Sequence, residues 1–269
     1  MKIAAVQVTS GSDINNNLTI AQRAVREAAG EGARVIVLPE GMSQAFDSGR
    51  LDTQAEELDG PFATGLKELA QELDVVIVAG MFRPADTREV DGKKINRVSN
   101  TALVTGAGHH VGYDKIHTYD AFDYSESDTV RPGSDLVSLE VDGVKVGVTI
   151  CYDIRYPEQY KDLARDGAEV IVVPTSWADG PGKLEQWRTL VSARALDSVS
   201  YVVAADQARP GGEEKGGQES GPTGIGHSII AGPDGVRLAE AGYEPEIIYA
   251  DIDPEKVRKA RKALPILED

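Results

Sequence analysis

The stretch GARVIVLP at residues 32–39 recurs almost unchanged, 135 residues later, as GAEVIVVP at residues 167–174. Each copy is a short β-branched apolar run between a glycine and a proline, which is typical of a strand buried in a parallel sheet. Each copy is preceded by a strand-like run and a helical pattern, and it is followed by a further helical pattern and a further run. The repeat therefore predicts two βαβαβ halves.

Short apolar runs alternate with helical patterns along the whole chain. Strands are predicted at 2–8, 34–38, 75–81, 101–105, 109–114, 144–150, 170–173, 201–205, 227–231 and 247–252. Helices are predicted at 14–29, 61–73, 157–167, 182–199 and 254–263. Asp13 is placed to cap the first helix, Pro157 to begin the third, and Asp142-Gly143 to form a tight hairpin turn.

The two halves are expected to pack face to face. A sheet with helices on one face has to bury its other apolar face against a further layer. If the two sheets cover each other, the result is a four-layer α-β-β-α sandwich of the α/β class. A chain of 269 residues can still form one α/β domain, and we interpret residues 1–269 as a single domain.

Composition excludes several classes of protein. The chain has 28 Lys and Arg against 44 Asp and Glu, a formal net charge of −16, and 41% of its residues are hydrophobic. General nucleic-acid binding needs clustered positive charge, and the basic run at 256–262 is interpreted as the solvated face of a C-terminal helix. No apolar run approaches the roughly 20 residues of a membrane span, and Met1 leads straight into a predicted strand. We expect a cytoplasmic protein with no nucleic-acid or membrane partner.

Cysteine and histidine content limits redox and metal chemistry. Cys151 is the single cysteine, so intramolecular disulfides are excluded. The four histidines lack the spacing of metal ligands, and no metal site is predicted.

Residues 209–224 are the least regular segment of the chain. Glycines, prolines and charged residues fill it, and such a segment cannot bury enough apolar surface to fold alone. We interpret it as a mobile loop. Its role is either functional, as a lid or an oligomer contact, or it is a surface loop without a specific function.

Three chemically capable side chains directly follow predicted strands. Glu40 follows VIVLP, Lys115 follows HHVGYD, and Cys151 follows VKVGVTI. Ligand-binding residues gather just beyond the carboxyl ends of parallel strands. The repeat makes the strands before Glu40 and Cys151 central in their halves, so we expect the acid, the amine and the thiol to converge.

A nucleophilic cysteine needs a neighbouring cation or a base that takes its proton. Lys115 can supply the cation and Glu40 the base, an arrangement suited to attack on a carbonyl or nitrile carbon. The alternative is a Cys-His pair, for which the candidate bases are His109, His110, His117 and His227. A buried structural cysteine is the third interpretation of Cys151.

The sequence resembles the nitrilase, or carbon-nitrogen hydrolase, superfamily over essentially its whole length. The family's three signatures match VIVLPEG with Glu40, GYDKIH with Lys115 and GVTICYDIRYPE with Cys151. A further family element, a second Glu before a Pro-Gly turn, matches ESDTVRPG and points to Glu126. The resemblance implies an αββα fold that associates through paired sandwiches, and so a homodimer or higher oligomer.

The resemblance also implies a mechanism without metal or organic cofactor. An amide or nitrile would be hydrolysed through a thioester or thioimidate on Cys151, with Glu40 as general base. Lys115 and the backbone N–H of Tyr152 would stabilise the tetrahedral intermediate. Glu126 would position Lys115 or the leaving amine, unless it is only a solvated acid in a polar stretch.

The residues after the nucleophile, Cys-Tyr-Asp-Ile-Arg-Tyr-Pro-Glu, are similar to the amidase branch with omega-amidase and deaminated-glutathione amidase. Those amidases act on small carboxylate-bearing amides, with release of ammonia. Arg155 is a candidate to hold the carboxylate, or else it forms a structural salt bridge. Phe46 and Trp177 can be pocket walls or core residues. An N-carbamoyl amide hydrolase, a nitrilase and a catalytically lapsed binding protein remain alternatives.

Two polar positions are given no catalytic role. Arg194 and Asp197, three residues apart on a predicted helix, are interpreted as a surface ion pair. Asn100 matches a position that is often polar in the family.

Overall fold

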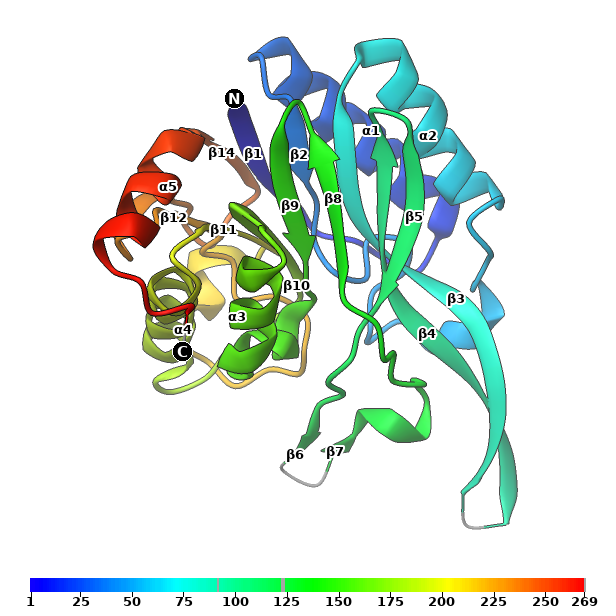
Figure 1. Ribbon diagram of the computed structural model, residues 1–269. Helices are drawn as coiled ribbons and strands as arrows, with labels where there is room; N and C mark the ends of the chain where they lie inside the picture. Colours follow the sequence, from blue (N-terminus) through cyan, green and yellow to red (C-terminus); the bar gives the residue numbers. More distant parts are fainter. Residues whose placement is uncertain (91, 122–123, 269) are drawn as a thin grey trace.

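The computed structural model describes residues 1–90, 92–121 and 124–268. Two six-stranded sheets pack face to face, and helices lie on their outer sides (Figure 1). The strand order is β14-β1-β2-β3-β4-β5 in the first sheet and β13-β12-β11-β10-β9-β8 in the second. The α/β sandwich predicted from the repeat is confirmed. Within the described ranges, no helix is long and apolar enough to cross a membrane.

The centre of each sheet consists of three parallel strands. In the first sheet these are β1 (Lys2–Gln7), β2 (Val35–Val37) and β3 (Val76–Val90). In the second they are β9 (Val144–Val148), β10 (Val170–Thr175) and β11 (Tyr201–Asp206). The repeated stretches are thus β2 and β10, each in the middle of its parallel triplet.

Antiparallel strands complete both sheets. They are β4 (Lys93–Gly106), β5 (His109–Asp114), β8 (Val137–Val141), β12 (Ile229–Ala231), β13 (Arg237–Glu240) and β14 (Glu246–Asp251). A separate two-stranded ribbon pairs β6 (Asp120–Ala121) with β7 (Tyr124–Ser125). Asp142 and Gly143, both at positive φ, form the predicted tight turn between β8 and β9.

The five helices found in the described ranges match their predicted bounds within about two residues. They are α1 (Ile14–Gly30), α2 (Pro61–Leu73), α3 (Pro157–Arg165), α4 (Lys183–Ser198) and α5 (Pro254–Ala263). Asp13 caps α1 by accepting a 2.7 Å bond from the Asn16 backbone N–H, and Pro157 begins α3, as predicted.

Alternate residues of the central strands face two different apolar layers. Ile3 and Ala5 of β1 belong to the cluster that joins the two sheets, whereas Ala4 and Val6 belong to the cluster under α1 and α2. Burial on both faces explains why these strands are continuous apolar runs rather than alternating ones.

Three sequence-based expectations need correction. β3 and β4 extend far beyond the predicted 75–81 and 101–105 as a long hairpin, whose outer part lies beyond the sheet (Figure 1). Arg194 does pair with Asp197, but it is a buried residue whose Nε donates a 2.6 Å bond to the Ile154 carbonyl. The face of α5 is not wholly solvated, because the Arg261 guanidinium donates to backbone carbonyls of neighbouring segments.

Residues 209–224, expected to be a mobile loop, contain the short 3₁₀ turn η4 (Gly212–Lys215) and are held by side-chain contacts. Arg209 pairs with the buried Asp179 at 3.0 Å and donates to the carbonyls of Lys215 and Gln218. The Ser176 hydroxyl donates a 2.7 Å bond to the Pro222 carbonyl. The loop is therefore joined to the segment that follows β10.

Candidate active site

Glu40 lies in a tight turn directly after β2, as the strand-end argument predicts. Gly41 has a φ of 62°, and a Cβ on Gly80 of β3 would lie only 2.5 Å from the Glu40 Cα, so the turn requires both glycines. The Glu40 carboxylate is buried. Its Oε2 accepts a 2.9 Å bond from the Ser176 backbone N–H, and its Oε1 accepts a 2.7 Å bond from the Asn100 amide. These contacts fix its orientation.

Lys115 follows β5, and its ammonium group lies between two carboxylates. Nζ is 3.2 Å from Glu40 Oε1 and 3.0 and 2.9 Å from the two carboxylate oxygens of Glu126. The residue is only 2% exposed. A buried ammonium requires opposite charges and hydrogen bonds to offset its lost hydration, and the two carboxylates provide both.

Glu126 begins the 3₁₀ turn η2 (Glu126–Asp128) and is 3% exposed. The alternative interpretation of a solvated acid is therefore wrong. Besides Lys115, its Oε2 accepts a 2.6 Å bond from the Tyr119 backbone N–H. Glu126 thus holds the Lys115 ammonium in place from a segment far from Glu40 in the chain.

Cys151 lies where the strand β9 passes into the 3₁₀ turn η3 (Cys151–Arg155). Its φ is 44°, a left-handed conformation that is strained for a residue with a side chain and that gathers at functional sites. Asp153 stabilises the turn by accepting a 2.9 Å bond from the Ile150 N–H. The Tyr152 N–H lies in the first turn of η3, where a backbone donor has no acceptor within the helix.

Burial governs the ionisation of this cluster. Burial raises the pKa of the Cys151 thiol well above its ordinary value, and the Glu40 charge adds to the rise, while Lys115 opposes it. Burial raises the pKa of Glu40 as well, against the effect of Lys115. Burial alone would lower the pKa of Lys115, but the carboxylates of Glu126 and Glu40 outweigh it, so that pKa is well above its usual range. The geometry therefore favours a neutral thiol next to a base over a preformed thiolate.

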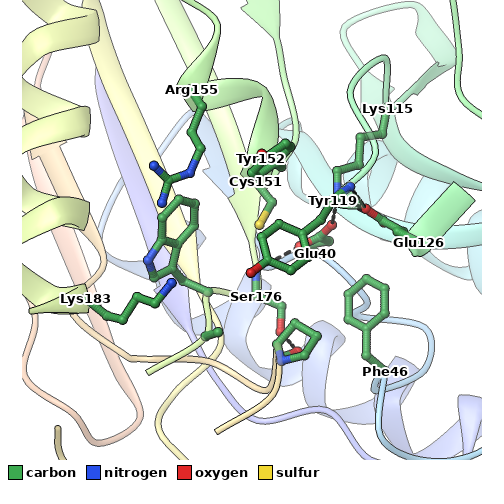
Figure 2. Close-up of a pocket in the computed structure, with 13 residues that line it drawn as sticks. Glu40, Phe46, Lys115, Tyr119, Glu126, Cys151, Tyr152, Arg155, Ser176 and Lys183 are labelled. Carbon is green, nitrogen blue, oxygen red and sulfur yellow. Dashed lines mark hydrogen bonds and ion pairs between the residues drawn. The ribbon is translucent and has the colours of Figure 1, made fainter. Parts of the chain in front are cut away.

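A single pocket brings the predicted site residues together (Figure 2). All eight predicted side chains line it: Glu40, Phe46, Lys115, Glu126, Cys151, Tyr152, Arg155 and Trp177. Five further lining residues were not predicted: Tyr119, Ser176, Ala178, Lys183 and Pro222.

Phe46 and Trp177 are both wall and core residues. Phe46 packs edge-on against Phe82, with ring centroids 5.3 Å apart. Trp177 is 5% exposed and packs at 5.2 Å on Trp187, which is fully buried. The two interpretations of these aromatics are therefore compatible.

Arg155 lines the pocket, and within the described ranges it makes no ion pair with a carboxylate. Its Nη2 donates a 3.2 Å bond to the Gln186 side chain. The guanidinium carbon lies 5.1 Å from the ring centre of Trp177 and 5.8 Å from that of Tyr152. The structural salt bridge considered for Arg155 is not found among residues 1–90, 92–121 and 124–268, and Figure 2 shows the side chain at the pocket.

The Cys-His alternative is not supported by the geometry. No histidine is among the described residues that line the pocket. His117, the nearest candidate in sequence to Lys115, instead bonds Asp153 through Nδ1 at 2.8 Å and stacks on Tyr156. The described part of the chain also contains no cluster of His, Cys, Asp or Glu that could hold a metal ion.

Asn100, which received no role from the sequence, contacts both carboxylates of the cluster. Its Nδ2 lies 2.7 Å from Glu40 Oε1 and 3.5 Å from Glu126 Oε1. Its backbone carbonyl also accepts a 2.8 Å bond from the Lys115 N–H. The strand pairing of β4 with β3 and β5, rather than any local motif, brings Asn100 to the site.

Comparison with known proteins agrees with this geometry. A family model described as carbon-nitrogen hydrolase matches residues 2–262. The chain is 34% identical over 273 residues to deaminated glutathione amidase of Escherichia coli O157:H7, covering 100% of this chain and 97% of that protein. It is 33% identical over 274 residues to omega-amidase NIT2 of Danio rerio, covering 98% and 92%.

A solved structure has the same architecture. Nit3 of Saccharomyces cerevisiae, described as a member of branch 10 of the nitrilase superfamily, superposes with a TM-score of 0.79 at 29% sequence identity. The superposition covers 99% of this chain and 94% of that one. The sandwich is therefore shared over nearly the full length of both proteins.

Proposed function

The chain belongs to the carbon-nitrogen hydrolase family and is a cysteine-dependent hydrolase of C–N bonds. From this we propose that it cleaves a small linear amide that bears a carboxylate. The reaction proceeds through a thioester on Cys151 and releases ammonia. One observation carries the proposal: the Lys115 ammonium lies between the carboxylates of Glu40 and Glu126, in the pocket that contains the Cys151 thiol.

Glu40 is the general base of the acylation step. Burial raises the pKa of the Glu40 carboxylate, although the neighbouring Cys151 thiol is among the groups that lower it. The thiol and the carboxylate line the same pocket, which supports proton transfer from Cys151 to Glu40. As the sulfur bonds to the carbonyl carbon, the thiol proton passes to Glu40. The proton then passes to the amide nitrogen as the C–N bond breaks, and ammonia leaves.

Lys115 and the Tyr152 N–H stabilise the negative charge that develops on the carbonyl oxygen. A buried ammonium with an elevated pKa remains protonated through the reaction, and a fixed donor in a dry site stabilises an oxyanion strongly. Glu126 is a positioning residue, since its two oxygens hold the ammonium at 2.9 and 3.0 Å.

Hydrolysis of the thioester uses Glu40, Lys115 and Cys151 again, now with water as the nucleophile and the Cys151 sulfur as the leaving group. With ammonia gone, the Glu40 carboxylate accepts a proton from a water molecule that attacks the thioester carbon. The C–S bond breaks, the acid product forms, and the thiol of Cys151 regains its proton. No residue outside the cluster and no cofactor is needed for this sequence of steps.

Arg155 is the anchor for the substrate carboxylate. Its position on the pocket wall, without a carboxylate partner among the described residues, supports this role. The relatives named deaminated glutathione amidase and omega-amidase also support an amide substrate of this class. Phe46 and Trp177 close the apolar walls beside it.

Intact-protein mass spectrometry with a panel of small amides tests the proposal. We expect a transient acyl adduct on the wild type and none on Cys151→Ala, with ammonia released only by the wild type. The mass of the adduct identifies the acyl group. Adducts of equal yield on both proteins would contradict the thioester on Cys151.

A second comparison tests the substrate class. Dicarboxylate monoamides should release ammonia faster than N-carbamoyl compounds of similar length. Ammonia release from the carbamoyl compounds alone would replace the amidase with an N-carbamoyl amide hydrolase, which would use the same Glu40, Lys115 and Cys151.

We further propose that the protein is a cytoplasmic homodimer, as the family resemblance implies. Sedimentation of the purified protein at several concentrations tests the oligomeric state. A single species with the mass of the 28.7 kDa chain would contradict the dimer.

A further inference from the structure

Asp206, the last residue of β11, is a fully buried carboxylate that lies behind the pocket and does not line it. Its Oδ1 accepts hydrogen bonds from the backbone N–H groups of Trp177 and Gln207, at 2.9 and 2.8 Å. Its Oδ2 accepts a 3.2 Å bond from the Ile225 N–H. These donors belong to the segment after β10, the end of β11 and the far end of the loop at 209–224. One carboxylate therefore joins three separate segments of the chain.

Asp206 is held by neutral groups alone. Among the residues that the structure describes, no lysine, arginine or histidine forms an ion pair with it. Burial raises the pKa of Asp206 well above its ordinary value, and the bonds from the three N–H groups oppose that rise. Neutral donors offset the cost of burying a carboxylate only in part. A carboxylate has two acceptor oxygens where an asparagine of the same size has one, so Asp206 is matched to the three donors that it joins.

The position of Trp177 depends on its backbone. Its indole Nε1 is buried and has no hydrogen-bond partner among the described residues. The ring is held by packing, with its centre 5.2 Å from that of Trp187. The backbone is anchored on both sides, since the N–H donates to Asp206 and the carbonyl accepts a 3.2 Å bond from the Gly224 N–H. Loss of the bond to Asp206 would therefore free one of the two backbone anchors of this pocket residue.

Trp177 supports the guanidinium of Arg155. The guanidinium carbon lies 5.1 Å from the centre of the Trp177 ring, within the range of a cation–π contact. In Figure 2, Arg155 lies on the opposite side of Cys151 from Lys115 and Glu126. The wall at Trp177 thus belongs to the part of the pocket where the guanidinium lies, and the charged groups of the reaction lie on the other side.

We propose that Asp206 is a positioning residue for substrate recognition: it holds Trp177, and through Trp177 the guanidinium of Arg155, in the place where the substrate carboxylate binds. This inference rests on the proposed function, in which Arg155 is the anchor of that carboxylate. Asp206 itself does not touch the substrate. Its bond to Ile225 also fixes the end of the loop that supplies the wall residue Pro222.

Three roles for Asp206 predict three different effects on substrate binding. If Asp206 positions the pocket wall, its replacement misplaces the guanidinium of Arg155, and KM for a substrate with a carboxylate rises. If Asp206 acted through its negative charge, removing that charge would favour an anionic substrate, and KM would fall. If Asp206 only stabilised the fold, KM would not change.

Steady-state kinetics of Asp206→Asn tests the proposal. The variant keeps the size of the side chain but turns an N–H group toward backbone donors, so the bond to Trp177 or to Ile225 has to break. KM for a dicarboxylate monoamide should rise about three- to tenfold, as for one lost hydrogen bond. The value of kcat, and KM for a neutral amide of the same length, should change less. Ser200→Ala is the matched control, because it removes buried hydrogen bonds just before the other end of β11.

A second variant and a second readout complete the test. Asp206→Ser is too short to reach all three donors and should raise KM at least as much, so it tests the proposal if Asp206→Asn does not fold. The chain has two tryptophans, and Trp177→Phe gives the fluorescence of Trp187 alone. Acrylamide should quench the remaining signal, that of Trp177, more strongly in Asp206→Asn than in the wild type.

The outcomes separate this inference from the proposed function. A wild type that hydrolyses neither amide contradicts the proposed function, whereas the quenching of Trp177 reports on its contact with Asp206 in either case. With an active wild type, a folded Asp206→Asn whose KM for the dicarboxylate monoamide is unchanged or lowered contradicts the positioning role. An equal rise of KM for both amides, or unchanged quenching of Trp177, contradicts it as well.

Discussion

The hydroxyl of Tyr113 donates a 2.6 Å hydrogen bond to the carboxylate of Asp153, and this contact joins the strand before Lys115 to the turn that carries Cys151. The same carboxylate accepts bonds from the backbone N–H groups of Ile150 and His117, at 2.9 and 3.0 Å. Asp153 is fully buried. Asp153 therefore fixes the position of the Cys151 thiol relative to the Lys115 ammonium, although Asp153 does not line the pocket.

Replacing Asp153 should impair catalysis through misplacement. Asp153→Asn keeps the size of the side chain but puts an N–H group among donors, so one of its bonds has to break. We expect kcat to fall about 10- to 100-fold, because a shift of about 1 Å at reacting groups has such an effect. KM should change little. Tyr113→Phe, which removes one of these bonds, should have a smaller effect. An Asp153→Asn protein with lowered stability but unchanged kcat would contradict the positioning role.

Glu40 and Lys115 should change the reactivity of the Cys151 thiol in opposite directions. Burial and the Glu40 charge raise the pKa of the thiol, and Lys115 lowers it. The rate of alkylation by iodoacetamide should therefore rise only at a pH above the ordinary thiol range. The midpoint should move to lower pH in Glu40→Gln and to higher pH in Lys115→Met. Mass spectrometry over a range of pH gives the three midpoints, and equal values would contradict this coupling.

Much of this site could be predicted because it follows a general property of parallel sheets. Glu40, Lys115 and Cys151 each lie within three residues of the end of a strand. The repeat at 32–39 and 167–174 identifies β2 and β10 as the central strands. The strand β2 before Glu40 is central as expected, whereas β9 before Cys151 lies at the side of its parallel triplet, so that part of the expectation was wrong. Glu126 follows no such strand in the prediction, and only the family resemblance pointed to it.

Other features depend on contacts that a local pattern does not contain. Asn100 reaches Glu40 because β4 pairs with β3, the neighbour of β2, and Asp153 reaches Tyr113 across 40 residues. The outer parts of β3 and β4 are mostly polar and exposed, so they have no apolar periodicity to recognise. Lys183, at the start of α4, lines the pocket that also contains the η3 residues Cys151 and Arg155, and α4 contacts η3.

Glu126 should influence the pH range of activity through Lys115. The charge of Glu126 raises the pKa of Lys115, so Glu126→Gln should lower it. Lys115 would then lose its proton at lower pH, and the alkaline limb of the kcat/KM profile should move to lower pH. A loss of activity at neutral pH of about 10- to 1,000-fold is expected for weakened oxyanion stabilisation. Asp128→Asn, in the same turn, is the control, and an unshifted alkaline limb in Glu126→Gln would argue against this role.

Arg155 should determine the preference for substrates with a carboxylate. Arg155→Met retains part of the packing against Trp177 but removes the charge. KM for a dicarboxylate monoamide should rise about 10- to 100-fold, as for the loss of a charge-assisted hydrogen bond. KM for a neutral amide of the same length should stay nearly constant. A variant whose KM rises equally for both compounds would show that Arg155 shapes the pocket without binding the carboxylate.

The buried pair of Arg209 and Asp179 should control the order of the loop at 209–224. Asp179 accepts bonds from the Arg209 guanidinium at 3.0 Å and from the Gly217 N–H at 2.9 Å. Arg209→Met leaves this buried carboxylate without its cation, and such a loss typically lowers the free energy of unfolding by about 3–5 kcal/mol. If the loop detaches locally, Asp179 becomes solvated and the loss of unfolding free energy is smaller. The same detachment removes Pro222 from the wall of the pocket.

Hydrogen exchange distinguishes this coupling from a general loss of stability. In Arg209→Met the amides of residues 212–222 should exchange faster while those of β10 remain protected, and KM should rise more than kcat falls. The double variant Arg209→Met/Asp179→Asn should regain part of the stability, because no buried charge is left unpaired. Arg26→Met, which breaks the exposed pair with Glu72, should change little. Unchanged exchange at Gly217 in Arg209→Met would mean that the ion pair does not hold the loop.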